Sequence, residues 1–86
     1  MMANGRRLLL IEDDAAFGRT LARSFERRGY AVRGVASLDA QAPLLETFSP
    51  THAVVDLKLA AGGSGLACVK ALHAHDPDML IVVLTG

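Results

Sequence analysis

The chain has 86 residues, of which 51% are hydrophobic and 21% are charged. This length allows one small domain, and this composition excludes a disordered or collagen-like chain. Nine basic and nine acidic side chains cancel, so the net charge gives no drive toward DNA or a membrane surface. The single cysteine excludes an internal disulfide bond. A reducing compartment fits this cysteine content, and we expect a cytoplasmic location.

No stretch of the sequence is apolar for long enough to cross a membrane. The longest apolar run covers residues 79–84, whereas a spanning helix needs about 20 apolar residues. Arginine is in excess over acid in residues 1–33, and acid is in excess over lysine in residues 34–86. We therefore expect no membrane partner and no nucleic-acid binding by this portion.

Four segments have the composition of β-strands. Residues 8–11, 53–55 and 80–84 are continuous apolar runs, which suit strands buried on both faces of a sheet. Residues 31–35 alternate between apolar and other side chains, as an edge strand does. The sequence therefore predicts four strands, three of them strongly apolar.

The first helix is predicted over residues 15–28. Asp14 is placed to cap its start, and Gly29 is placed to end it. One face repeats an apolar side chain every fourth residue: Phe17, Leu21 and Phe25. Arginines recur at the same spacing on another face, which is typical of a solvated surface, with kinase docking as the alternative.

A second helix is predicted after Ser37, with these side chains facing inward: Leu38, Ala42, Leu45 and Phe48. Pro43 lies inside this segment, and proline lacks an N–H and clashes with the preceding helical turn. We therefore expect the helix to start near Gln41 or Ala42, or to be kinked.

A third helix is predicted over residues 64–73, with Leu66, Val69 and Leu72 as its buried stripe. Cys68 is interpreted as a small core residue of this helix. Strands and helices then alternate along the whole chain, which indicates right-handed crossovers and a parallel sheet covered on both faces. The fold class is thus α/β, a flavodoxin-like doubly wound sheet with neighbours in the order 2-1-3-4, and its ligand site is expected at the carboxyl ends of the strands.

Polar side chains follow three of the predicted strands. Glu12, Asp13 and Asp14 follow the first strand, Asp56 follows the third, and Thr85 follows the fourth. Crowded carboxylates are costly unless a cation or a proton relieves them, and Mg²⁺ prefers oxygen ligands of this kind. The Thr85 hydroxyl can hydrogen-bond an anionic group. A simpler interpretation, in which acids only cap the following helix, stays open for Asp14.

These segments together resemble the receiver domain of two-component response regulators, with its CheY-like fold. The matching segments are residues 9–14, 53–59, 65–66 and 81–86. The residues of these segments are most similar to those of the redox-responsive RegA/PrrA/ActR-type regulators. The resemblance covers essentially the whole chain and implies a sensor histidine kinase as partner and Mg²⁺ as cofactor. For a longer, full-length protein the resemblance implies that the receiver regulates an output function. In the RegA-type regulators this function is transcription.

The resemblance also implies a role for each matching residue. Asp56 matches the phosphoacceptor, which takes a phosphoryl group from a phosphohistidine. Asp13 matches the acid that binds Mg²⁺ directly, and Glu12 matches the acid that acts through water. The backbone carbonyl of Lys58 matches a third metal ligand. Thr85 matches the hydroxyl that moves to the phosphoryl group. Such a protein is a phosphoacceptor and not an enzyme.

The sequence departs from the family pattern at three points. Ala60 stands where proline is common, and the loop over residues 60–65 is one residue longer than usual. The family's lysine on a fifth strand has no counterpart before the chain ends at Gly86. We therefore expect residues 1–86 to be the N-terminal two thirds of a receiver, without the fifth strand or the fourth and fifth helices.

Two function classes follow from this interpretation. The first is a phosphoacceptor receiver that uses Asp56. The second is a non-phosphorylated interaction or dimerisation module with a receiver-like surface. Residues 79–84 are apolar and uncharged, which makes an exposed fourth strand prone to pair with another chain. We therefore expect a homodimer through this strand.

Overall fold

The computed structural model describes residues 5–56 and 65–84, without the side chains of residues 38–42. Its strands are β1 (Arg7–Ile11), β2 (Ala31–Val35), β3 (His52–Asp56) and β4 (Leu80–Leu84). They pair in parallel in the order β2-β1-β3-β4. This order confirms the predicted doubly wound sheet.

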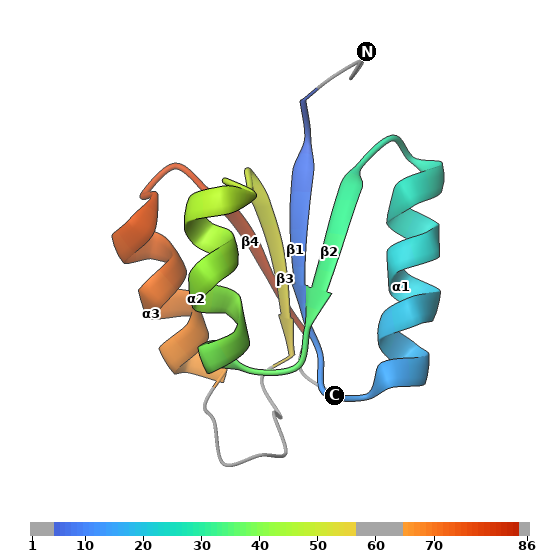
Figure 1. The fold of residues 1–86 in the computed structure, drawn as a ribbon, viewed down its shortest axis with the longest axis horizontal. Helices are drawn as coiled ribbons and strands as arrows, with labels where there is room; N and C mark the ends of the chain where they lie inside the picture. Colours follow the sequence, from blue (N-terminus) through green and yellow to red (C-terminus); the bar gives the residue numbers. More distant parts are fainter. Residues whose placement is uncertain (1–4, 57–64, 85–86) are drawn as a thin grey trace.

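Three helices cover the two faces of this sheet, α1 on one side and α2 with α3 on the other (Figure 1). Their bounds are Ala15–Arg27 for α1, Leu38–Thr47 for α2 and Gly65–His75 for α3. In the described part of the chain, none of these helices is long and apolar enough to cross a membrane.

Helix α1 begins and ends where the sequence predicts. The Asp14 carboxylate accepts a hydrogen bond from the Phe17 N–H at 3.0 Å, so Asp14 caps the first turn. Gly29 has a φ of 94°, a backbone conformation that glycine adopts readily. Leu21 and Phe25 pack against the sheet, whereas Phe17 is 46% exposed. The apolar stripe is therefore buried only from the second turn onward.

The prediction of a late start for α2 is wrong. The helix runs from Leu38 to Thr47 and includes Pro43. Pro43 is exposed, and as the sixth residue of the helix it leaves one helical hydrogen bond unmade because it has no N–H. Leu45 packs inward as predicted, together with Leu44. The predicted inward side chains of Leu38 and Ala42 lie outside the described part.

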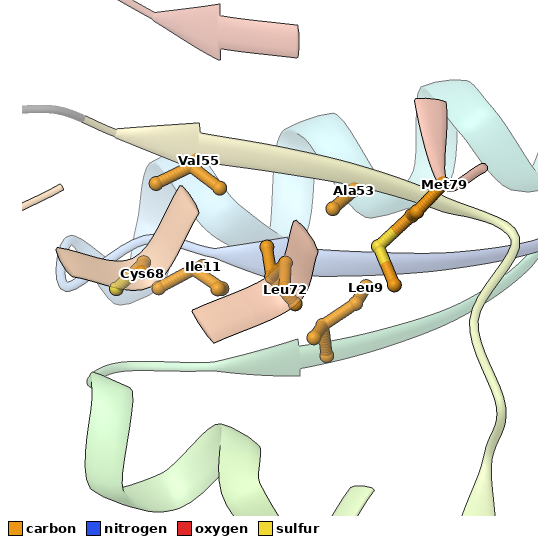
Figure 2. Packing of buried hydrophobic residues seen from close by; sticks show 7 residues of the cluster. All are labelled: Leu9, Ile11, Ala53, Val55, Cys68, Leu72 and Met79. Carbon is orange, nitrogen blue, oxygen red and sulfur yellow. The ribbon is translucent and has the colours of Figure 1, made fainter. Parts of the chain in front are cut away.

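The main core lies between the sheet and the layer of α2 and α3. Figure 2 shows how its buried side chains face one another; they are Leu9, Ile11, Ala53, Val55, Cys68, Leu72 and Met79. A second cluster on the α1 side contains Leu8, Leu10, Val32 and Val54. Strands β1 and β3 thus bury apolar side chains on both faces, as their continuous apolar runs predict.

Helix α3 corrects one prediction and confirms another. Cys68 is fully buried, as predicted, and so is Leu72, but Leu66 is 59% exposed. Leu66 precedes Cys68 by two residues, which is about 200° around a helix, so both cannot face the same core. The buried face is Gly65, Cys68 and Leu72, with Val69 half-buried beside it.

Strand β4 is the edge of the described sheet, and it is poorly covered. Leu80 is 64% exposed and Val82 is 57% exposed. These side chains share the α1 face of the sheet with Val54, which is paired with Val82. The expectation that the fourth strand is an exposed edge is confirmed for the described residues.

Helix α3 supplies a matched test of where the core lies. We expect Leu72→Ala to lower the free energy of unfolding by about 2–5 kcal/mol, because the substitution leaves a cavity in the core. Leu66→Ala on the same helix is expected to change it by no more than about 0.5 kcal/mol. Urea denaturation followed by circular dichroism measures both. Equal losses for the two variants would contradict this assignment of the buried face.

Candidate functional site

The carboxyl ends of β1 and β3 bring three carboxylates together. Ile11 lies opposite Val55 in the parallel register, so Glu12 and Asp56 emerge at the same edge of the sheet. One oxygen each of Glu12, Asp13 and Asp56 lies within 4.8 Å of the other two. The structure thus places side by side the acids that the strand ends predict to converge.

Glu12 is the most constrained of these acids. Its side chain is 8% exposed, and its backbone N–H donates to the Val35 carbonyl at 3.0 Å. Oε2 accepts a hydrogen bond from the Asp14 N–H at 3.1 Å. Oε1 is buried and has no hydrogen-bond partner. A buried carboxylate oxygen without a partner is costly, so a hydrogen-bond donor or a cation at Oε1 would stabilise the site.

The electrostatics of the site favour a proton or a cation. Burial raises the pKa of Glu12 above its ordinary value, the hydrogen bond from the Asp14 backbone opposes that rise, and the negative charges of Asp56 and Asp13 add to it. Burial disfavours the charged form of Glu12, and the neighbouring carboxylates repel it. A proton or a bound cation at this site would offset the repulsion between the carboxylates.

The donor set fits a hard divalent cation. Carboxylate oxygens are the ligands that Mg²⁺ takes, and Mg²⁺ keeps several of its waters when only one or two carboxylates bind it. The orphaned Glu12 Oε1 gives such a cation, or a water that it holds, a place to bind. Asp14 caps α1 instead, so the capping interpretation is confirmed for this acid. Lys58 and Thr85, the other predicted site residues, lie outside the described residues.

A cavity of about 350 Å³ adjoins the carboxylates between α1 and β2. Glu12 and Asp13 line one end, and Arg19 lines another part. Small residues on the two facing elements leave the space open: Ala15, Gly18, Ala22, Gly34 and Ala36. A Cβ added at Gly18 would reach 3.7 Å from Glu12 Cγ, an ordinary contact. The sequence does not predict this cavity, because its walls come from elements whose separation no local pattern encodes.

Comparison with known proteins identifies the family. The family model described as response regulator receiver domain matches residues 8–86. The photosynthetic apparatus regulatory protein RegA of Rhodobacter capsulatus is 40% identical over 85 residues, which make up 99% of this chain and 46% of RegA. The acid tolerance regulatory protein ActR of Rhizobium meliloti strain 1021 is 43% identical over 79 residues, 92% of this chain and 40% of ActR. The chain spans less than half the length of these relatives.

Solved structures give the same result. A response regulator of Burkholderia pseudomallei, solved with a phosphorylated aspartic acid, a calcium ion and citrate, matches with a TM-score of 0.86 at 41% identity, over 94% of this chain and 47% of that one. A CheY-like receiver domain protein of Methanospirillum hungatei JF-1 matches with a TM-score of 0.86 at 26% identity, over 94% and 64% of the two chains. The resemblance and the CheY-like fold predicted from the sequence are confirmed.

The raised pKa of Glu12 predicts how stability depends on pH in the absence of divalent cations. A carboxyl group whose pKa is raised in the folded state stabilises that state below its unfolded value of 4.5, and this contribution is lost as the pH rises through the folded value. We therefore expect Glu12→Gln to raise the thermal midpoint at pH 8 in EDTA and to leave it almost unchanged at pH 4.

Differential scanning fluorimetry with an external dye measures both midpoints. Glu46→Gln is the matched control, because Glu46 is an exposed glutamate on α2. A Glu12→Gln midpoint that stays below wild type at pH 8 would show that the charge at this position is not a burden on the fold.

Proposed function

Because the chain belongs to the response regulator receiver domain family of two-component systems, we propose that it accepts a phosphoryl group on Asp56 from a sensor histidine kinase. The observation that carries this proposal is the convergence of Glu12, Asp13 and Asp56 at one edge of the sheet, with their oxygens within 4.8 Å. Asp56 is half-buried at the end of β3, so its carboxylate is fixed by the strand and still open to a partner.

The chemistry of the proposal is a transfer between two side chains. An Asp56 carboxylate oxygen attacks the phosphorus of the kinase's phosphohistidine, an O–P bond forms, the P–N bond breaks, and the electron pair of that bond returns to the imidazole. The product is an acyl phosphate, a mixed anhydride that stores the signal until it is hydrolysed. The positioned carboxylate is the nucleophile, and the transfer depends on placement and on neutralised charge rather than on further covalent steps.

Mg²⁺ is the cofactor in this proposal. Glu12, Asp13, Asp56 and the backbone carbonyl of Lys58 would hold it, and Thr85 would hydrogen-bond the phosphoryl group. When bound, Mg²⁺ supplies positive charge that offsets the charge of the carboxylates and of the phosphoryl oxygens. The raised pKa of Glu12 and the orphaned Oε1 support this assignment, because a bound cation would offset both.

The proposed role is that of a cytoplasmic signalling module rather than an enzyme. The added charge on Asp56 would bias the surface that an output recognises. Transcription is the proposed output of a longer protein, since RegA and ActR are named as regulatory proteins. The chain covers 64% of the CheY-like receiver of M. hungatei, which supports reading residues 1–86 as the N-terminal two thirds of a receiver domain.

Phosphorylation of the 86-residue chain tests the proposal directly. With Mg²⁺ and acetyl phosphate, we expect intact-mass spectrometry to show the gain of one phosphoryl group, and no gain in EDTA. Asp56→Asn is expected to abolish the gain, because the amide is not a nucleophile of this kind. Asp78→Asn is the control, because Asp78 is an exposed aspartate on the turn before β4.

Two outcomes would redirect the assignment. A phosphoryl gain that persists in Asp56→Asn would overturn Asp56 as the acceptor. A folded wild-type chain that gains nothing would favour the second function class, the non-phosphorylated interaction module. Circular dichroism of each variant separates loss of the acceptor from loss of the fold.

We also propose that the 86-residue chain forms a homodimer through β4. The exposed Leu80 and Val82 side chains and the edge position of β4 in the described sheet support it, because an exposed apolar edge pairs readily with another strand.

We expect light scattering at concentrations on the order of tens of micromolar, where exposed edges associate, to give the mass of a dimer. Val82→Lys is expected to give a monomer, and Leu66→Lys, an exposed site on α3, is expected to leave the dimer intact. A folded wild-type monomer at these concentrations would contradict it.

A further inference from the structure

A second group of interacting side chains lies at the amino ends of the strands, far along the sheet from the carboxylates. His52 is the first residue of β3, whereas Asp56 is the last. His52 is half-buried and contacts Tyr30, which precedes β2; the ring centroids are 5.1 Å apart at an interplanar angle of 87°. The Arg6 guanidinium lies over the same tyrosine ring, 4.5 Å from its centroid. We call Arg6, Tyr30 and His52 the amino-end cluster.

The cluster ties several elements together. Tyr30 also packs edge-on against Phe25 of α1, with centroids 5.6 Å apart. Arg6 Nη2 donates to the carbonyl of Arg28 at the end of α1, at 3.0 Å, and the Arg6 carbonyl accepts from the Ala31 N–H, also at 3.0 Å. The cluster therefore fastens the C-terminal end of α1 to the starts of β1, β2 and β3.

The hydrogen bonds of His52 tolerate either protonation state. Its Nδ1 lies 2.7 Å from the Thr51 hydroxyl oxygen. That oxygen also accepts from the Arg7 N–H at 3.0 Å and is 3.1 Å from the Arg7 carbonyl, to which it can donate. When Nδ1 carries a proton it donates to the hydroxyl, and the hydroxyl donates onward to the carbonyl. Hydrogen bonding therefore does not hold His52 neutral.

Charge and burial do hold it neutral. In the described part of the chain, the groups facing His52 are the Arg6 guanidinium, the Tyr30 phenol ring and the Thr51 hydroxyl, while its strand neighbours Leu8 and Leu80 are apolar. Burial lowers the pKa of His52 below its ordinary value of 6.5, and the positive charge of Arg6 lowers it further. An imidazolium here would share the Tyr30 ring with a second cation, the Arg6 guanidinium.

We propose that His52 is a proton-sensitive switch. Its protonation weakens the contacts within the amino-end cluster and breaks the hydrogen bond by which Arg6 binds the end of α1. A histidine kept neutral in the folded state contributes stability that is present above pH 6.5 and is lost as the pH falls through the folded-state pKa. The element that responds is the junction of α1 with β2, because Arg6 and Tyr30 form it. This inference does not depend on phosphorylation of Asp56.

The chain has one tyrosine and no tryptophan, so its intrinsic fluorescence reports on the amino-end cluster alone. We expect Tyr30 emission to show an acid transition with a midpoint below pH 6.5. His52→Gln is expected to abolish this transition. Arg6→Gln is expected to move it to higher pH, because the like charge is removed. His73→Gln and His75→Gln, both exposed sites on α3, are the matched controls and are expected to leave it unchanged.

Loosening has its own measurement. The Ala31 amide donates to the Arg6 carbonyl, and the Glu12 amide donates to the Val35 carbonyl at the other end of the sheet. Through the same acid transition, we expect the hydrogen-exchange protection factor of the Ala31 amide to fall relative to that of the Glu12 amide. The His52 ring resonance in wild-type chain gives the midpoint without any substitution. The proposal is overturned by a His52 midpoint at or above 6.5, by a transition that survives His52→Gln, or by parallel protection of the two amides.

Discussion

The parallel pairing of β1 with β3 is the constraint on which the rest of the molecule depends. It sets Leu8 to Ile11 beside His52 to Val55, and parallel pairing sends both strands out of the sheet at the same edge. The acids that follow the two strands therefore meet, whatever the cost of their mutual repulsion. A shift of the register by one residue would turn each core side chain to the opposite face and separate the carboxylates.

The apolar side chains of the same two strands offset that cost. Leu9, Ile11 and Val55 are fully buried or nearly so on one face, and Leu8, Leu10 and Val54 on the other. Burial of such side chains contributes about 1.5–3 kcal/mol each, so the six together hold the strand pair that brings the carboxylates close. The molecule thus places its cluster of three carboxylates at the ends of β1 and β3, its most deeply buried strands. The outer strand β4 lacks this double cover, so the stability is concentrated at the centre of the sheet.

The sequence predicts the features that follow from local pattern. Four strands come from apolar runs, their order comes from the flavodoxin-like class that the alternation of strands and helices indicates, and Asp14 and Gly29 mark the limits of α1. Two predictions failed where packing decides. The predicted stripe of Leu66, Val69 and Leu72 holds except at Leu66, which is exposed. Helix α3 is apolar on most sides, so periodicity alone does not fix which side faces the core. Pro43 removes one helical hydrogen bond, yet α2 includes it, at an exposed position. The convergence of the acids follows from strand ends, whereas the burial of Glu12 Oε1 does not, because it depends on how α1 sits over β1.

The two ends of the β1–β3 pair carry titratable groups whose effects on the stability of the fold depend on pH in opposite directions. Burial favours the neutral form of Glu12 at one end and of His52 at the other. The first group weakens the fold as the pH rises, and the second weakens it as the pH falls. A cation among the carboxylates stabilises the charged form of Glu12 and removes the first effect, while it leaves the second untouched because His52 lies four residues further back along β3. A cation bound among the carboxylates would therefore remove the pH dependence that Glu12 contributes and leave the pH dependence that His52 contributes.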